Sequence, residues 1–389
     1  MIKAGTGKSS APEARKAGEE ACREALAKIG GKADLVIVFS TVNYDQTEVL
    51  KGVKTESKNA LLAGCSSIRG IVNGVGLDNA VVIMAVASDK ITFQVGVGKR
   101  AKENSKGAGR MLAESLSSKE ISVLMVFLEA VGVNGSAVVR GIQEGSRKNL
   151  PIIGGMASDA STFTKTYQYY EGQVLTDSVV GIGLSNGFAY GVGAQHGWES
   201  IGLPVKVTKS KGSVIQEINH KPAIKFFEGF FGEKAKQLEK PLSRICYVYP
   251  LGMNIKGSAE LLIRNAFVAT KKGEIVCAGE IPQGSEIRLM LGDKEKAIKA
   301  AKKAAECAKK QLKGARPKAI FVFDCAARYM LLGSQADEEI KAIQAVLGEE
   351  VPLVGFYTYG EQAPLRGVLG PECRSMFHNE TMTLFVLAE

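Results

Sequence analysis

Six short polar loops follow apolar runs of the chain, and each offers groups that could hold a small ligand. Glycines in such loops let a ligand approach backbone N–H groups, and nearby polar side chains can fix its orientation. The loops are residues 40–45 (STVNYD), 64–69 (GCSSIR), 129–136 (EAVGVNGS), 154–159 (GGMASD), 324–329 (DCAARY) and 355–361 (GFYTYGE). Their candidate ligand contacts are Asn43, Ser66, Asn134, Gly155, Asp159, Arg328, Tyr357 and Glu361.

Two cysteines, Cys65 and Cys325, directly follow apolar runs. A helix N-terminus at such a position can lower the pKa of a thiol and make it nucleophilic. The base of such a nucleophile would be a histidine, and His196 and His378 are the candidates. A cysteine- and histidine-dependent enzyme is therefore one reading, and small buried cysteines are the structural alternative.

Arg328 and Glu361 follow apolar runs of the same repeated unit. The planar guanidinium group of arginine suits a carboxylate, so these two residues could meet a zwitterionic ligand. A structural ion pair between them is the alternative.

The sequence contains no motif for the common metal, nucleotide or hydrolase sites. The chain has three histidines and seven cysteines without a CxxC pair, so the sequence predicts neither a metal site nor a disulfide framework. It also has no P-loop, dinucleotide fingerprint, GxSxG elbow or HExxH motif. We expect no cofactor.

Composition limits the partners. A net charge of +10 results from 50 basic and 40 acidic residues spread along the chain, and aromatic residues make up only 7%. This composition disfavours a nucleic-acid partner. No apolar run approaches the roughly 18 residues that span a bilayer, and the N-terminus has no secretory signal. We expect a cytoplasmic protein that binds no membrane.

The elements that position the loops recur along the chain. DLVIVF ends at Phe39, VLMVF at Phe127 and AIFVF at Phe323. Each run is followed by a polar loop, a helical pattern and a second apolar run that closes on glycine. This order predicts three βαβ units with parallel strands.

The remaining segments complete the predicted fold. Residues 10–30 have the pattern of an amphipathic helix, so residues 1–33 are assigned to an N-terminal helix. Neighbouring β-rich runs, 79–88 with 90–98 and 177–185 with 187–195, predict hairpins. A length of 389 residues predicts two lobes. The fold class is α/β, with two lobes built from repeated βαβ units, mixed and partly parallel sheets, and added antiparallel hairpins.

Several motifs together resemble the FIST family of sensory domains. They are the run 196–227, which begins HGWESIG, and the motifs GGMASD, DCAARYMLLG, VGFYTYGEQAPL and FHNETMTLF. The resemblance extends from about Asp34 to the C-terminus and implies a FIST N-terminal domain at 34–220 and a FIST C-terminal domain at 221–389. One departure is NHKPA, where Asn219 and His220 replace the family's usual Asp-Gly.

The resemblance implies a signal-input protein that binds small ligands, with amino acids proposed. Trp198 and Asn379, which lie in the resembling motifs, join the candidate ligand-binding residues. We expect the chain to act without an output domain of its own and to signal through a separate protein. Some family members resemble haem-based nitric oxide sensors, so haem bound by His196 or His378 is an alternative.

Overall fold

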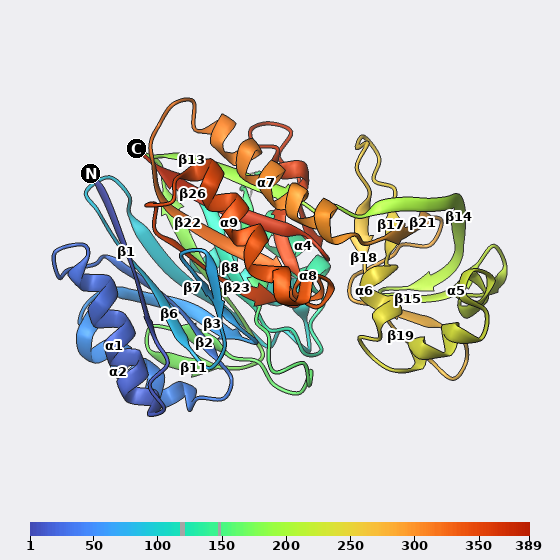
Figure 1. Cartoon of the computed structure of the whole chain (residues 1–389), viewed down its shortest axis with the longest axis horizontal. Helices are drawn as coiled ribbons and strands as arrows, with labels where there is room; N and C mark the ends of the chain where they lie inside the picture. Colours follow the sequence, from blue (N-terminus) through green and yellow to red (C-terminus); the bar gives the residue numbers. More distant parts are fainter. Residues whose placement is uncertain (117–120, 147–148) are drawn as a thin grey trace.

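A computed structural model describes residues 1–116, 121–146 and 149–389 of the chain. It contains a large lobe of three six-stranded sheets and a small lobe with a fourth, eight-stranded sheet. Figure 1 shows the small lobe at the right and the two chain ends close together on the far side of the large lobe. Among the described residues, no helix is both long and apolar enough to cross a membrane.

The large lobe consists of three similar units. The first comprises β1 (Ile2–Ser9), α1 (Ala14–Ala27), β2 (Leu35–Thr41), α2 (Gln46–Ser57), β3 (Leu61–Ser67), β4 (Gly70–Val72), β5 (Val75–Leu77) and β6 (Val81–Ser88). The second comprises β7 (Phe93–Lys99), α3 (Ser105–Ser115), β8 (Ile121–Leu128), α4 (Gly135–Ser146), β9 (Ile152–Met156), β10 (Gln168–Tyr170), β11 (Gln173–Leu175) and β12 (Ser178–Ser185).

The third unit is interrupted by the small lobe. It comprises β13 (Ala189–Gln195), α7 (Lys294–Gln311), β22 (Pro317–Cys325), α8 (Ala326–Leu332), α9 (Ala336–Leu347), β23 (Leu353–Thr358), β24 (Glu361–Pro364), β25 (Ser375–His378) and β26 (Met382–Ala388). The three predicted βαβ units are confirmed, because β2 and β3, β8 and β9, and β22 and β23 are parallel pairs.

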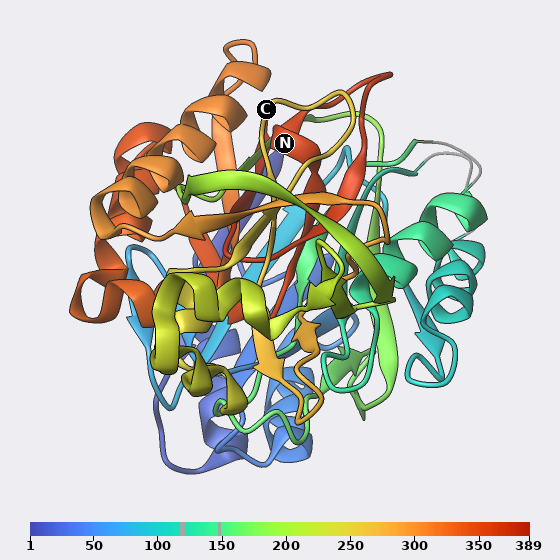
Figure 2. The same ribbon diagram turned by 90° about the vertical axis from the view of Figure 1, so that its right-hand side faces the viewer.

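The units exchange their short hairpins in a ring. Hairpin β4–β5 of the first unit pairs with β23 of the third, β10–β11 of the second pairs with β3 of the first, and β24–β25 of the third pairs with β9 of the second. The helix pairs α1 with α2, α3 with α4, and α7 with α9 lie on three sides of the sheets (Figure 2). The large lobe is therefore a closed assembly of three interlocked units.

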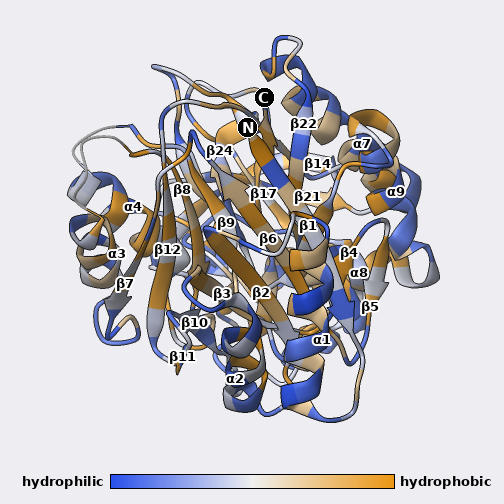
Figure 3. Cartoon of the chain, turned by 90° about the vertical axis from the view of Figure 1, so that its left-hand side faces the viewer, coloured by the Kyte–Doolittle hydropathy of each residue, from blue (hydrophilic) through white to orange (hydrophobic). Residues whose placement is uncertain are grey.

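The repeated phenylalanines meet at the centre of this assembly. The ring centroids of Phe39 and Phe127 lie 5.6 Å apart, and those of Phe127 and Phe323 lie 6.5 Å apart. All three rings are fully buried in the largest hydrophobic cluster. Figure 3 shows the apolar strands inside and the polar faces of α1 and α2 outside. Burial of these strands is the main driving force for the fold.

The small lobe is formed by residues 199–291. Its elements are β14 (Glu199–Lys211), β15 (Val214–Ile218), β16 (Lys221–Pro222), α5 (Ile224–Phe231), α6 (Arg244–Val248), β17 (Leu251–Met253), β18 (Leu262–Arg264), β19 (Ala266–Ala269), β20 (Ile275–Cys277) and β21 (Glu286–Leu291). All its strand pairs are antiparallel. Two lobes are present, but their limits differ from those of the expected domains 34–220 and 221–389, because the small lobe is inserted between β13 and α7. Only the large lobe contains βαβ units.

Two details of the predicted fold are wrong. The N-terminal segment 1–33 contains a strand, β1, before its helix. The run IKAGTGKS lacks the β-branched pattern because its glycines approach α1 closely: a Cβ on Gly7 would lie 1.9 Å from the Ala21 carbonyl oxygen. The runs 79–88 and 90–98 form β6 and β7 of different sheets, and 177–185 and 187–195 form β12 and β13 of different sheets. These short connections link successive units and do not close hairpins.

Candidate functional site

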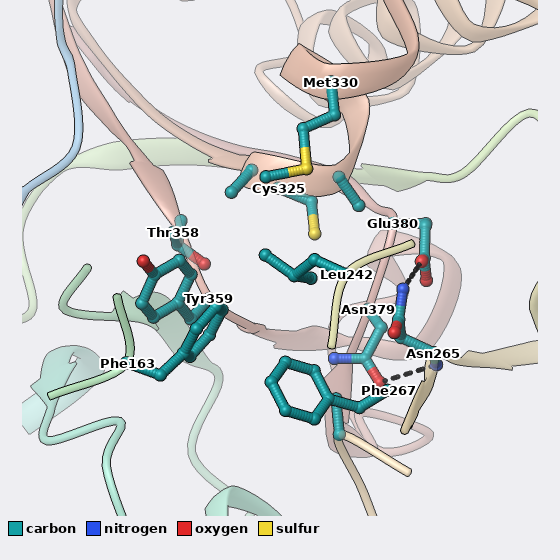
Figure 4. Close-up of a pocket in the computed structure, with 13 residues that line it drawn as sticks. Phe163, Leu242, Asn265, Phe267, Cys325, Met330, Thr358, Tyr359, Asn379 and Glu380 are labelled. Atoms are coloured by element: carbon teal, nitrogen blue, oxygen red, sulfur yellow. Dashed lines mark hydrogen bonds between the residues drawn. The ribbon is translucent and has the colours of Figure 1, made fainter. Parts of the chain in front are cut away.

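Two adjacent cavities lie between the lobes. The outer one has a volume of about 430 Å³ and the inner one a volume of about 50 Å³. Both are lined by Phe163, Phe267, Ala278 and Tyr359. We call the two together the interlobe cavity, and Figure 4 shows the smaller one, its inner end. Its size is that of a site for a small organic molecule.

Loops at the ends of parallel strands line the large-lobe side of this cavity. The loop after β8 contributes residues 130–134, the loop after β9 contributes Phe163, and the ends of β22 and β23 contribute Cys325 and Thr358. The small lobe contributes residues 276–280 and Phe267. Four of the six predicted loops therefore converge here, as expected for the carboxyl ends of parallel strands. The loops 40–45 and 64–69 do not line it.

Asp159 holds the loop that carries Phe163. Its carboxylate accepts hydrogen bonds from the backbone N–H groups of residues 162–165 and, at 2.6 Å, from the Tyr359 hydroxyl. Burial opposes ionisation, but these hydrogen bonds lower the pKa of Asp159 to about 2. The Phe163 ring stacks on Tyr359 at a centroid distance of 4.2 Å and meets Phe267 of the small lobe at 4.9 Å. Asp159 thus positions Phe163 and Tyr359, two of the aromatic residues that line the cavity.

The inner end combines apolar walls with a few polar groups. Cys325 and Met330 come from the large lobe, and Leu242 covers them from the small lobe (Figure 4). The Asn265 side-chain amide donates to Glu380 Oε1 at 2.5 Å. Glu380 Oε2 and Asn265 Oδ1 are buried and have no hydrogen-bond partner among the described residues. Both residues line the cavity, but these two oxygen atoms are themselves buried within the protein.

Two buried glutamates lie near the inner end. Burial raises the pKa of Glu380 to about 8, although the Asn265 hydrogen bond and the nearby Arg264 guanidinium oppose the rise. Burial, together with the neighbouring Glu380 carboxyl group, also raises the pKa of Glu361 to about 8. Glu361 does not line the cavity, and both its oxygens accept hydrogen bonds, from Thr358 at 3.1 Å and Thr381 at 3.0 Å.

Glu280 lines the outer part of the cavity, and its carboxylate is paired with two side chains of the large lobe. Glu280 accepts hydrogen bonds from the Asn134 side chain and from the Arg140 guanidinium group, each at 2.6 Å. Asn134 also caps α4 by accepting from the Ala137 backbone N–H group. These contacts join the loop after β8 to the small lobe.

The predicted Arg328–Glu361 pair does not form. Arg328 is fully buried and binds Glu339 at 2.6 Å and Asp324 at 3.1 Å instead. Its remaining N–H groups donate to backbone carbonyl oxygens, including that of Ala297 at 2.8 Å. Asp324 at the end of β22, four residues before Arg328, and Glu339 on the adjacent helix α9 thus pair with Arg328 in place of Glu361. Arg328 therefore links elements inside the protein and cannot bind a zwitterionic ligand in this geometry.

Neither candidate histidine lines the interlobe cavity. His378 is buried and lies 3.1 Å from the Ala363 carbonyl oxygen, and burial lowers its pKa to about 3. The Nδ1 atom of His196 accepts from the Trp198 N–H group at 3.0 Å, and its Nε2 atom lies 3.4 Å from Glu260. Burial and the nearby Arg328 charge lower the pKa of His196 to about 4. The residues present therefore do not fit a histidine-bound haem in the cavity.

The candidate cysteines do not have the environment of a nucleophile. Burial raises the pKa of both Cys65 and Cys325 well above the ordinary thiol value. For Cys325, the nearby Glu361 and Glu380 carboxyl groups add to this rise. An activated thiol needs positive charge nearby that is not already neutralised. Arg328 lies near Cys325, but it is paired with Asp324 and Glu339.

The sequence-predicted site residues are thus distributed over several places. Asn134, Cys325 and Asn379 line the interlobe cavity. His196 and Trp198 line a second, more open hollow on another side of the lobe junction, together with Lys299, Lys303 and Arg366. Asn43 is exposed, and the others are buried without lining either space: Cys65, Ser66, Gly155, Asp159, Arg328, Tyr357, Glu361 and His378.

Sequence reasoning missed most of the cavity wall. Phe163 and Phe267 belong to no motif with a chemical signature, and Tyr359 lies in the predicted loop 355–361 but was not singled out. Asn265 and Glu280 lie in the small lobe, for which the sequence shows no repeat. Glu380 directly follows Asn379 in FHNETMTLF, so that motif was a signal for the inner end, as were the loops 324–329 and 355–361.

The geometry defines a two-lobed α/β protein with a ligand-sized cavity at the lobe junction. The family models FIST N domain and FIST C domain match residues 34–221 and 223–364. The chain therefore belongs to the FIST family, whose domains are known as sensory domains in signalling.

Relatives of known name give little further information. An uncharacterized protein of Mycobacterium tuberculosis (strain ATCC 25618 / H37Rv) is 26% identical over 381 residues, which cover 94% of this chain and 96% of the relative. An uncharacterized protein of Methanocaldococcus jannaschii is 28% identical over 339 residues, covering 79% of this chain and 63% of the relative.

Among solved structures, a cyanuric acid hydrolase is similar over 100% of both chains, with 8% identity and a TM-score of 0.32. A second one, from A. caulinodans, has a TM-score of 0.30 with 8% identity, covering 100% of this chain and 99% of that one. Similarity at this level carries no conclusion about fold or chemistry.

Proposed function

We propose that the protein is a small-ligand sensor and that its ligand binds in the interlobe cavity. The observation that carries this proposal is the cavity itself, lined by four strand-end loops of the large lobe and by the small lobe. A ligand there would contact both lobes at once, so its binding energy would favour one arrangement of the lobes over others.

The cavity wall also supports a binding role over catalysis. An aromatic group, Phe163, Phe267 and Tyr359, gives a ligand a large apolar contact area at low entropic cost. Two cysteines line the cavity, Cys325 and Cys277, and burial raises the pKa of both thiols. No histidine is among the described residues of the cavity lining. We infer that a small metabolite such as an amino acid binds here, and that a separate signalling protein senses the small lobe.

Thermal-shift measurements against amino acids, amines and small carboxylates test the proposal. A ligand should raise the melting temperature, because it stabilises the folded state by RT ln(1 + [L]/Kd). The variant Ala278→Phe should abolish the response, because Ala278 lines both parts of the cavity.

The matched control is Ala259→Phe, which places the same ring in the second hollow. This control should keep the response. Loss of the response in Ala259→Phe and its retention in Ala278→Phe would move the site to the second hollow. A broad panel without any response would remove the proposal.

A further inference from the structure

One hydrogen-bond donor at the inner end of the interlobe cavity has no acceptor. The side-chain amide nitrogen of Asn379 points into the cavity (Figure 4) and donates to no residue that the structure describes. Asn379 is only 2% exposed, and its amide oxygen accepts from the Asn265 backbone N–H group at 3.4 Å, which sets the orientation of the amide. Donors of buried residues usually have an acceptor, because an unpaired one opposes folding. A ligand can supply that acceptor.

The unpaired acceptors at the inner end offer no comparable contact. Asn265 Oδ1 and Glu380 Oε2 lack a partner among the described residues, but protein atoms enclose both of them. The amide nitrogen of Asn379 is not enclosed in this way. Glu380 also carries little negative charge at neutral pH, because burial raises its pKa to about 8. The inner end is therefore suited to a hydrogen-bond acceptor of a ligand and not to an ammonium group.

A positive charge lies directly behind the cavity wall. A Cβ on Gly279, which lines the outer part, would lie 2.9 Å from Arg264 Nε. Burial lowers the pKa of the Arg264 guanidinium group to about 10, so the group is still charged at neutral pH. It donates to the backbone carbonyl oxygens of Ile263, Glu280 and Phe377 and forms no ion pair with a carboxylate in the described part of the chain. Its charge attracts the negative end of a ligand.

The shape of the cavity separates a polar end from an apolar body. The inner part, about 50 Å³, has room for only a few non-hydrogen atoms, whereas the outer part, about 430 Å³, can take a ring or a branched chain. Phe163 and Phe267 line both parts. Glu280 on the outer wall is matched by Arg140 at 2.6 Å, so its carboxylate does not call for a cation. An elongated molecule with an acceptor at one end matches this outline.

We propose that the sensed ligand carries a carbonyl or carboxylate oxygen, which accepts a hydrogen bond from the Asn379 side-chain amide while the apolar body of the ligand lies against Phe163 and Phe267. This inference rests on the proposed function and specifies the polar group of its ligand. An amino acid would enter the inner end with its carboxylate.

Three compounds of nearly equal shape test the inference by calorimetric titration of the full chain: phenylacetate, phenylacetamide and phenethylamine. We expect both oxygen compounds to bind more tightly than the amine. Asn379→Leu keeps the size of the side chain and removes the donor, so it should weaken the binding of both oxygen compounds by roughly threefold to tenfold, as for one hydrogen bond. The order of the two oxygen compounds then distinguishes a carboxylate from an uncharged carbonyl group as the preferred polar end.

The control is Gln195→Leu, which removes a buried side-chain amide from the wall of the second hollow and should keep all three affinities. Melting curves without ligand show whether both variants fold. If Asn379→Leu does not fold, the order of the three compounds on the wild type decides.

Phenethylamine binding that is tighter than that of both oxygen compounds and is lost in Ala278→Phe would overturn the inference and leave the sensor intact. Affinities for the oxygen compounds that are unchanged in a folded Asn379→Leu would also overturn it. Absence of binding by all three compounds would overturn it as well, and the proposed function would fall with it only if the thermal-shift panel also gave no response.

Discussion

At the scale of single residues, burial decides what each polar group can do. Asp159, Arg328 and His378 were candidate ligand contacts, yet each is saturated by neighbours within the protein. Glu380 and Asn265 line a cavity, and one buried oxygen atom of each has no hydrogen-bond partner within the part of the chain that the structure describes. A sequence shows residue types but not which hydrogen bonds each residue makes. It therefore cannot distinguish residues whose polar atoms are paired within the protein from residues that line the cavity.

Thiol reactivity follows from the same burial. Six of the seven cysteines are buried, and Cys307 is partly exposed. We expect iodoacetamide at neutral pH to label Cys307 in the native protein and to label Cys65 and Cys325 only after unfolding, because burial raises the pKa of both thiols. Mass spectrometry of the labelled peptides measures this. Native labelling of Cys325 faster than Cys307 would instead favour the enzyme reading.

The buried glutamates predict a pH dependence of stability. The folded-state pKa of Glu361, about 8, lies above the roughly 4.3 of an unfolded chain. Between these values the folded state holds a proton that the unfolded state has released, so stability is fully present below pH 4.3 and is lost as the pH rises toward 8. One such group contributes up to about 1.4 kcal/mol per pH unit.

Urea denaturation at several values between pH 5 and pH 8 tests this dependence. Glu361→Gln should show a shallower loss of unfolding free energy than the wild type. The exposed Glu372→Gln serves as the control and should follow the wild type. Parallel curves for the wild type and Glu361→Gln would contradict the raised pKa.

At the scale of elements, close helix–strand packing depends on glycine. A Cβ on Gly193 of β13 would lie 2.2 Å from the Ala304 carbonyl oxygen of α7. Because this oxygen belongs to the backbone, a side-chain rotation cannot remove the clash. Gly193→Ala should therefore destabilise the protein by roughly 1–3 kcal/mol.

Gly229 of α5 provides the matched substitution. A Cβ there meets no atom within 4 Å, so Gly229→Ala should be neutral or stabilising by up to about 1 kcal/mol. Urea unfolding of both variants measures the difference. Equal stability of the two would show that the β13–α7 contact can adjust.

Local patterns explain which elements were predictable. Strands β2, β8 and β22 contain nearly continuous apolar runs, and α7 has an Asp293 cap, so local sequence was sufficient to predict these elements. Strand β1 was missed because its side chains are small where α1 packs on it. The false hairpins arose because a short connection between strands is also how one unit passes to the next.

At the scale of the whole molecule, local sequence patterns cannot predict how the three units are arranged. The exchange of hairpins pairs residues far apart in the sequence, such as Ile71 with Gly355. The small lobe is an insertion between β13 and α7, and its two connections meet where Trp198 packs near Gly292 and its indole N–H donates to the Tyr247 carbonyl oxygen. This junction places the small lobe over the strand ends and so creates the cavity.

The central claim is that one small molecule binds between the lobes, and hydrogen–deuterium exchange tests it most directly. The ligand that gives the largest thermal shift should slow amide exchange in residues 129–134 of the large lobe and in residues 276–280 of the small lobe together. Slower exchange confined to residues 195–199 and 296–303, around the second hollow, or no slowing in either lobe, would contradict the claim.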